Sequence, residues 1–305
     1  MADPLDLVPL GPWASTLVEG DPGESGPLEF GTRYEILGVV SSGPMGEVRR
    51  CRDRPLARDV AMKVLPHGNA RIARWRFLRE ARVQAQLRHA GVVPVHDIGL
   101  DGEERPFFTM SWIEGRSFRE ALAAGLARGA ALDVLTQVCR AVAYAHARGV
   151  VHRDLKPSNV RVDEDGAAYL MDWGLAKLTS EEEEAEPITD ASGAVETRAG
   201  SVLGTIGYMS PEQLRGEVER VDTSADVYGL GAMLFEVLTG APLHPGKRAQ
   251  RALSILRTDG ASPAGRAPAL TIPPALDEAC VAATRLDPAA REISAAELAA
   301  LLSAR

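Results

Sequence analysis

The segment at residues 150–162, VVHRDLKPSNVRV, carries polar side chains whose types and spacing could do chemistry. Asp154 and Asn159 lie five positions apart with Lys156 between them, and Asp172 follows Asn159 by thirteen positions in YLMDWGLAK. Carboxylate and amide oxygens near a strand end can hold Mg²⁺, which prefers oxygen ligands and often shares them with phosphates. Phosphoryl transfer needs little more from a protein than a positioned hydroxyl and neutralised phosphates. The pattern therefore favours phosphoryl-transfer chemistry.

A glycine-containing turn at residues 39–48, VVSSGPMGEV, is a second candidate for phosphate binding. It contains Gly43 and Gly46, but Ser41 stands where a further glycine would be expected. Pro44 removes one backbone donor from the tip of the turn. From these residues alone, a working phosphate clamp, a degraded clamp and an ordinary hairpin all remain open.

Composition limits the class of protein. A chain of 305 residues suits one large domain or two packed lobes. A net charge of −8 leaves no basic footprint for a nucleic-acid partner. Three cysteines without a CxxC pair argue against a disulfide framework or a structural zinc site, so we expect a cytoplasmic location. We expect neither a signal peptide nor a membrane segment, because the apolar stretch at 227–238 is short and contains Glu236.

The elements that must position these side chains begin with a sheet-rich region. Residues 1–30 are rich in proline, glycine and acids and are predicted to form a flexible arm. Strand patterns follow in YEILGVV, VRRCRD, DVAMKVL, VVPVHDIGL and PFFTMSW. Between the third and fourth strands, residues 71–88 have the apolar spacing of an amphipathic helix whose other face is filled with arginines.

After Gly115 the pattern becomes mainly helical, interrupted by an acidic stretch of low hydrophobicity at about 179–200. Near the end of the chain, Ser294 and Glu297 have the spacing of a capping box that starts a helix. The sequence therefore predicts an α+β fold with a β-rich small lobe and a mainly helical large lobe.

Taken in order, these motifs resemble the eukaryotic-like (Hanks-type) serine/threonine protein kinases, and most closely those of bacteria. The resemblance runs from about Tyr34 to about Leu302. It implies the bilobal protein-kinase fold, with a kinase domain at 34–303, an N-lobe at about 34–113 and a C-lobe at about 114–303. The motifs are the glycine loop at 41–48, VAMK ending at Lys63, Glu80, HRDLKPSN at 152–159, DWG at 172–174, SPE at 210–212, Asp226 in DVYGLG, and Arg291 in DPAAR.

The resemblance assigns the catalytic roles position by position. Asp154 would accept the proton of the substrate hydroxyl, and Lys156, typical of serine/threonine kinases, would steady the γ-phosphate of ATP. Asn159 and Asp172 would hold Mg²⁺, with Mn²⁺ as an alternative ion. His152 is expected to have a structural role beneath the DWG turn. A buried ion pair between Glu212 and Arg291 is also expected.

The nucleotide site is implied in the same way. Lys63 would contact the α- and β-phosphates and pair with Glu80, so that the position of helix 71–88 would gate activity. Met110 matches the gatekeeper, and the backbone of Ser111 to Ile113 would hydrogen-bond adenine. The full set implied to bind nucleotide is Val40, Ser41, Gly43, Gly46, Val48, Ala61, Lys63, Met110, Ser111, Ile113 and Arg161.

Four positions depart from the family pattern. Ser41 and Pro44 are expected to stiffen the glycine loop and weaken or slow nucleotide binding without abolishing it. Arg161 falls where an apolar residue usually lies beneath adenine. Its guanidinium could reach solvent or a carboxylate, or stack on the base. Trp173 replaces the usual phenylalanine, and its indole N–H is expected to need a partner.

The function implied is ATP-dependent phosphorylation of serine and threonine hydroxyls on protein substrates. One alternative is a pseudokinase that signals by binding alone, although Lys63, Glu80, Asp154, Asn159 and Asp172 are all present. A small-molecule phosphotransferase is a second alternative, and the SPE and GTIGYM segments, which resemble a protein-substrate platform, argue against it.

Regulation is expected in the activation segment, residues 172–212. Arg153, directly before the expected base, would receive a phosphate from this segment. Autophosphorylation between two copies in a homodimer is expected, at Thr197 or Ser201 ahead of Thr189 and Ser192. The acidic run at 181–184 is expected to be a disordered insert, with docking on the arginines of helix 71–88 as the alternative. No sensor domain is expected, so the signal would come from a partner or from the N-terminal arm.

Overall fold

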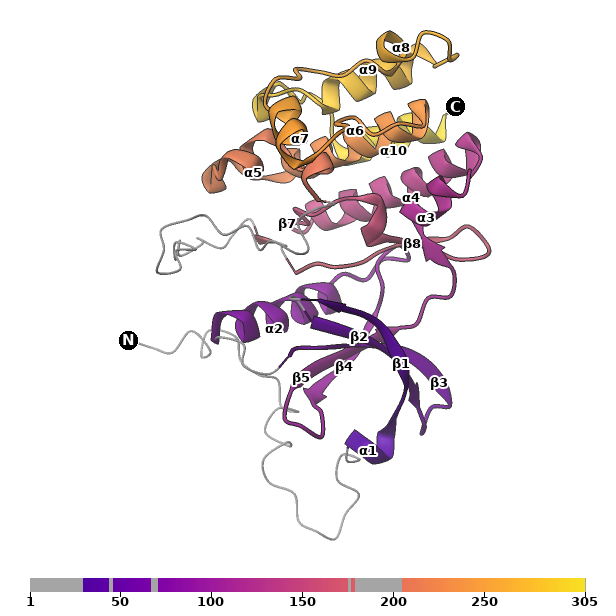
Figure 1. The fold of residues 1–305 in the computed structure, drawn as a ribbon, viewed down its shortest axis with the longest axis vertical. Helices are drawn as coiled ribbons and strands as arrows, with labels where there is room; N and C mark the ends of the chain where they lie inside the picture. Colours follow the sequence, from indigo (N-terminus) through magenta and orange to yellow (C-terminus); the bar gives the residue numbers. More distant parts are fainter. Residues whose placement is uncertain (1–29, 44–45, 67–70, 175–176, 179–204, 305) are drawn as a thin grey trace.

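The computed structural model describes residues 30–43, 46–66, 71–174, 177–178 and 205–304. These residues form two lobes that follow one another along the long axis of the molecule (Figure 1). The small lobe holds the main β-sheet and the helix α2, and the large lobe is mainly helical. The predicted bilobal α+β architecture is therefore confirmed.

The small lobe is built on a five-stranded antiparallel sheet with the order β1-β2-β3-β5-β4. The register places Ser41 opposite Val48, Val48 opposite Lys63, and Ala61 opposite Met110. Since directly paired residues and alternate residues along a strand share one face, these side chains lie on the same face of the sheet. The strands are β1 Tyr34–Gly43, β2 Gly46–Asp53, β3 Arg58–Val64, β4 Val95–Leu100 and β5 Pro106–Ser111.

Apolar side chains cover both faces of this sheet. One face carries a cluster that includes Tyr34, Met62 and Phe107, against which Phe30 of the short helix α1 (Phe30–Arg33) packs. The other face carries a cluster that joins Phe108 and Met110 to Phe77 of α2. The face that bears Lys63 is therefore the one that α2 packs against.

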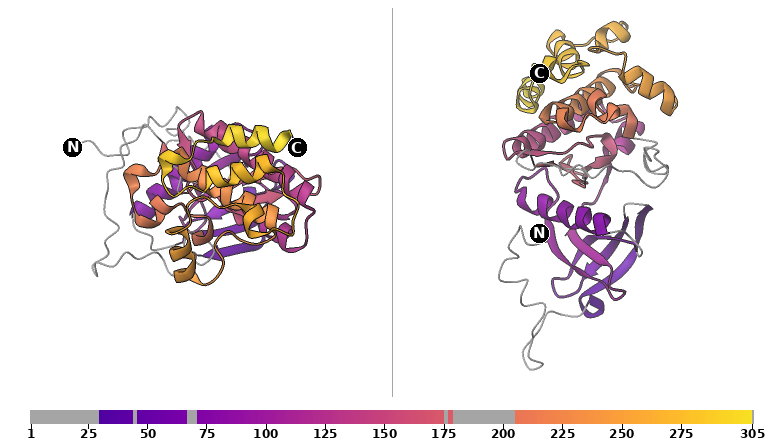
Figure 2. Two further views of the ribbon diagram at one scale, coloured as in Figure 1. Left: turned by 90° about the horizontal axis from the view of Figure 1, so that it is seen from above. Right: turned by 90° about the vertical axis from the view of Figure 1, so that its left-hand side faces the viewer.

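Helix α2, Arg71–Gln86, confirms the helix predicted from apolar spacing. Phe77, Glu80, Ala81 and Gln84 recur at helical intervals and are buried, whereas the outer face is exposed and rich in arginine. In two views at right angles, α2 lies at the end of the small lobe that faces the large lobe (Figure 1; Figure 2). This position brings Glu80 to the boundary between the lobes.

The large lobe is organised around α6, Thr223–Thr239, whose side chains are almost all buried. Both α4 and α9 pack against it. Among the helices that the structure describes, none is both long enough and apolar enough to cross a membrane. The other helices of this lobe are α3 Phe118–Ala123, α4 Arg128–His146, α5 Pro211–Arg215, α7 Arg248–Ile255, α8 Pro263–Arg266, α9 Pro274–Ala283 and α10 Ala295–Ser303, with 3₁₀ turns η3 Pro157–Asn159, η4 Thr205–Tyr208, η5 Val218–Arg220 and η6 Pro288–Ala290.

Short strands between the lobes carry the predicted site. Residues 152–159 connect β7 to β8, and the turn at 172–174 follows β9. Because β8 pairs antiparallel with β9, with Val160 opposite Leu170, the loop that leads into β8 and the turn that follows β9 lie at the same end of two neighbouring strands. The strands are β6 Arg116–Ser117, β7 Val150–Val151, β8 Val160–Val162, β9 Ala168–Leu170 and β10 Lys177–Leu178.

Candidate active site

The loop at 152–159 is shaped by a buried carboxylate of α6. Asp226 is 1 % exposed and accepts hydrogen bonds from the backbone N–H groups of His152 and Arg153, each at 2.8 Å. It also bonds His146 Nε2 at 2.8 Å. Burial opposes ionisation, but the hydrogen bond and charge of His146, together with the neighbouring donors, hold the pKa of Asp226 below its ordinary value. Asp226 therefore fixes a loop in which Arg153 adopts a left-handed φ of +68°.

His152 joins this loop to the turn that follows β9. Its Nδ1 accepts a hydrogen bond from the Asp154 N–H at 3.2 Å, and its Nε2 lies 3.0 Å from the Met171 carbonyl oxygen. This pattern suits a neutral ring that carries its proton on Nε2. The ring centroid lies 4.6 Å from that of Trp173. The predicted packing of His152 against the DWG turn is confirmed.

Trp173 is buried, with 1 % of its surface exposed. Its indole N–H was expected to have a partner, but within the described part of the chain it has none. The ring lies in the apolar core of the large lobe, whose aliphatic side chains supply no acceptor. The apolar body of the side chain, and not its N–H, therefore accounts for its position.

Asp154, Lys156 and Asn159 form one cluster at the end of the loop. Lys156 Nζ lies 2.6 Å from Asp154 Oδ2, and Asn159 Nδ2 donates to the same oxygen at 3.0 Å and to the Asp154 carbonyl at 2.9 Å. Asp154 Oδ1 is buried and accepts no hydrogen bond from the described residues. Burial raises the pKa of Asp154, although the charge of Lys156 opposes this. The cluster thus holds one carboxylate oxygen in place and leaves the other without a donor among the described residues.

Lys63, Glu80 and Asp172 form a second cluster, which joins the lobes. Lys63 Nζ lies 2.5 Å from Glu80 Oε1 on α2 and 3.1 Å from Asp172 Oδ1. Burial alone would lower the pKa of Lys63, but the two carboxylates outweigh it and raise the pKa. The charge of Lys63 holds the pKa of Asp172 below its ordinary value, and burial raises that of Glu80. Lys63 is therefore a cation placed between the sheet, α2 and the turn after β9.

The donor set at Asn159 and Asp172 fits a hard divalent cation. The Met171 N–H donates to the Asn159 carbonyl at 2.9 Å, which ties the two segments together. Among the described residues, no donor bonds the Asn159 amide oxygen or the second Asp172 carboxylate oxygen. Two such oxygens, completed by phosphate oxygens, are the usual protein contribution to a Mg²⁺ site. Asp172 has a left-handed φ of +68°, a strained conformation of the kind that concentrates at functional sites.

The side chains expected around adenine come together on the α2 face of the sheet. Val48, Ala61, Met110 and Ile113 belong to one apolar cluster. Ser111 ends β5, at the start of the linker to the large lobe. The sequence predicted this grouping, and the strand register explains it.

The glycine loop closes the hairpin between β1 and β2. Gly43 pairs with Gly46, and Val40 and Ser41 are exposed at the end of β1. Gly46 has a φ of +134°, and a Cβ there would lie 2.9 Å from the Val64 carbonyl oxygen. Gly46 is therefore required by its backbone. Pro44 lies outside the described residues.

Arg161 has a partner that the sequence did not suggest. Its Nε donates to the Ile113 carbonyl at 3.1 Å, and its terminal NH2 group donates to the Gly115 carbonyl at 2.7 Å. The guanidinium is partly exposed to solvent, and among the described residues no carboxylate forms an ion pair with it. Its donors go to the backbone of the linker between the lobes, so the arginine is not an unpaired charge.

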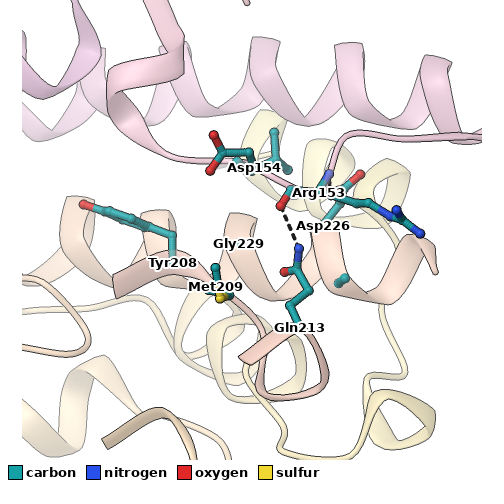
Figure 3. A pocket seen from close by; sticks show the side chains of 9 residues that line it. Arg153, Asp154, Tyr208, Met209, Gln213, Asp226 and Gly229 are labelled. Atoms are coloured by element: carbon teal, nitrogen blue, oxygen red, sulfur yellow. Dashed lines mark hydrogen bonds between the residues drawn. The ribbon is translucent and has the colours of Figure 1, made fainter. Parts of the chain in front are cut away.

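Two supporting residues were missed by sequence reasoning. His146 bonds Asp226. Gln213 donates to the Arg153 carbonyl at 2.7 Å, as Figure 3 shows. Gln213 also completes a capping box with Ser210 at the start of α5, and this S-x-x-Q spacing could have identified it. His146 lies at the end of a helical pattern, where a histidine is ordinary, so the sequence gives no sign of its role.

One further prediction can be compared with the structure, and a second group cannot. Arg291 and Glu212 form the expected buried ion pair, with two N–O distances of 2.7 Å. The expected phosphorylation sites and the acidic run lie outside the described residues: Thr189, Ser192, Thr197, Ser201 and residues 181–184.

Comparison with known proteins gives consistent matches. Residues 34–270 match the family described as protein kinase domain. The chain is 34 % identical over 282 residues to the serine/threonine-protein kinase PknB of Mycolicibacterium smegmatis, covering 90 % of this chain and 43 % of that protein. It is 39 % identical over 235 residues to the DNA damage-responsive serine/threonine-protein kinase RqkA of Deinococcus radiodurans, covering 74 % and 33 %. It is 36 % identical over 223 residues to the probable serine/threonine-protein kinase SCO3848 of Streptomyces coelicolor, covering 71 % and 31 %. The chain therefore spans less than half the length of these relatives.

Proposed function

The chain belongs to the protein kinase domain family, and from this premise we propose that it is an ATP-dependent serine/threonine protein kinase. The observation that carries the proposal is the meeting of two clusters at the lobe boundary. One is Lys63 with Glu80 and Asp172, and the other is Asp154 with Lys156 and Asn159. The first cluster holds a lysine that could bind the phosphates of a nucleoside triphosphate. The second holds a carboxylate that could accept a proton from a substrate hydroxyl group. Relatives at 34–39 % identity carry the name serine/threonine kinase.

The reaction needs positioning more than covalent chemistry from the protein. A serine or threonine hydroxyl would lie against the Asp154 carboxylate and give its proton to it as the hydroxyl oxygen bonds the γ-phosphorus. The bond from that phosphorus to the β-phosphate oxygen breaks, and ADP leaves with the electron pair. Lys63 would hold the α- and β-phosphates, and Lys156 would lie beside the transferred group. Mg²⁺, held by Asn159 and Asp172, would neutralise phosphate charge when bound.

Regulation by phosphorylation is part of the proposal. We place Thr197 and Ser201 as the first autophosphorylation sites, modified by a second copy of the chain, and Arg153 as the residue that receives the phosphate. Its backbone supports this role, because both its N–H and its carbonyl are fixed by buried partners, Asp226 and Gln213. The protein substrates would be met in the cytoplasm.

The first test is phosphate incorporation from γ-labelled ATP with Mg²⁺. The native chain is compared with Asp154→Asn, which keeps the size of the side chain but removes the proton acceptor. Label in the native chain or in a generic basic protein, and none with the variant, would support the proposal. Nucleotide binding without transfer by the native chain would favour the pseudokinase alternative. Mapping the labelled residues then tests Thr197 and Ser201.

A further inference from the structure

The linker between the lobes is held by side chains from both sides. From the large lobe, Arg161 on β8 donates to the carbonyls of Ile113 and Gly115. From the small lobe, the Arg50 guanidinium lies 4.9 Å from the Trp112 ring centroid, while that of Arg161 lies 5.9 Å from the same centroid. Both distances are within the range of cation–π attraction. We call this arrangement of Arg50, Trp112 and Arg161 the linker clasp.

The linker clasp leaves the two backbone groups of Ile113 in different states. The Ile113 carbonyl oxygen already accepts a charge-assisted hydrogen bond at 3.1 Å. The Ile113 N–H, in the part of the chain described, donates to no acceptor. At this residue the linker therefore offers a free donor and an acceptor that is already engaged by a cation.

Adenine and guanine require different hydrogen-bonding groups from such a residue. Adenine presents its N1 acceptor beside its N6 amino donor, and next to N1 on the other side lies only a C–H group. Guanine presents its O6 acceptor beside an N1–H donor. A residue that donates its N–H to guanine O6 has its own carbonyl next to the guanine N1–H. Guanine thus needs both groups of one residue, whereas adenine needs only the N–H from Ile113 and takes its second bond from another carbonyl.

We propose that Arg161 is a specificity-determining residue which selects adenine over guanine by occupying the Ile113 carbonyl. This inference rests on the proposed function, because it assumes that the nucleotide base lies against the linker. A carbonyl has two lone pairs, but a guanine N1–H that approached this one would share it with a guanidinium and meet the positive charge. Arg50 and Trp112 add to the effect, since they limit the movement by which the linker could turn another carbonyl toward the base.

The test measures nucleotide binding directly, so it does not depend on phosphoryl transfer. Dissociation constants for Mg-ADP and Mg-GDP are measured by isothermal titration calorimetry for the native chain and Arg161→Leu. Arg161→Lys is a second variant, because it keeps the charge but loses the two-carbonyl geometry. Arg52→Leu is the matched control: Arg52 pairs with Asp59, as Arg50 does, and is not part of the linker clasp.

The expected result is a fall in the GDP-to-ADP ratio of dissociation constants of about 3- to 10-fold in Arg161→Leu, the weight of one hydrogen bond. In Arg161→Leu the ratio should fall mainly because the dissociation constant for GDP falls. The ratio should fall less in Arg161→Lys and should not change in Arg52→Leu. A ratio that stays the same or rises in a folded Arg161→Leu chain would overturn the inference. So would a native chain that binds neither nucleotide. A native chain that prefers ADP but transfers no phosphate would count against the proposed function alone.

Discussion

His244 lies in the large lobe with both of its ring nitrogens bonded to hydroxyl groups. Its Nε2 is 2.8 Å from Tyr228 Oη, and its Nδ1 is 2.8 Å from Ser254 Oγ. The residue is wholly buried. Hydroxyl partners can accept from one ring nitrogen and donate to the other, so they suit the neutral ring, and they carry no negative charge to balance a protonated one.

This environment predicts a stability change with pH. Burial, helped by the charge of Arg266, lowers the pKa of His244 from 6.5 to about 4. Between these values the unfolded chain binds a proton that the folded chain does not, so the free energy of unfolding falls as the pH falls through this window. We expect His244 to account for about 2–3 kcal/mol of this loss. Urea unfolding of the native chain and His244→Gln from pH 7 to pH 4 measures it.

The difference between the two unfolding curves separates His244 from the carboxylates, which titrate in both proteins. The native chain should lose more stability than His244→Gln between pH 6.5 and pH 4. Parallel curves would contradict the assignment.

At the scale of elements, the turn after β9 packs closely against the helix α2. A Cβ on Gly174 would lie 2.9 Å from Glu80 Oε2. The same carboxylate bonds Lys63 through its other oxygen. The turn therefore limits where α2 can hold Glu80.

We predict that Gly174→Ala lowers kcat/KM for a protein substrate by about ten-fold or more. Displacing Glu80 would weaken a charge-assisted hydrogen bond worth about 1.5–3 kcal/mol, and 1.4 kcal/mol corresponds to a factor of ten. Gly129→Ala is the control, because nothing lies within 4 Å of a Cβ built at that position in α4. Equal kcat/KM values for the two variants would show that the contact between the turn and Glu80 does not affect activity.

The elements themselves were largely predictable, because their signals are local. The strands, the amphipathic α2 and the capping box of Ser294 with Glu297 each depend on residues a few positions apart, and all are observed. The helix expected through residue 88 ends at Gln86, and such boundary shifts are usual. The hydrogen-bond partners of Arg161 could not be predicted. They are the carbonyls of Ile113 and Gly115, 48 and 46 positions away, and they depend on where the linker passes β8 in the folded chain.

At the scale of the whole molecule, one ion pair joins the last part of the chain to the middle. Arg291 and Glu212 are both fully buried at their side chains and form two parallel hydrogen bonds of 2.7 Å. The remaining donors of Arg291 reach the carbonyls of Ser224, Arg285 and Leu286. All five guanidinium donors are therefore satisfied.

A double-mutant cycle tests what this pair contributes. Arg291→Met should lower the free energy of unfolding by about 3–5 kcal/mol, because it leaves Glu212 buried without its partner. The double variant Glu212→Leu with Arg291→Met should lose less than the sum of the single variants, since no charge remains buried. Denaturant unfolding gives all four values. Additive losses would show that the two residues stabilise the lobe independently.

Asp226 also sets an order of events during synthesis of the chain. The loop at 152–159 leaves the ribosome before α6 does, because Asp226 follows Arg153 by 73 positions. Until that carboxylate is made and buried, the N–H groups of His152 and Arg153 lack the acceptor that gives the loop its shape. An unfinished chain therefore carries every residue of the expected Asp154 cluster but cannot yet hold them in place. The geometry of the site becomes complete only when the core of the large lobe does.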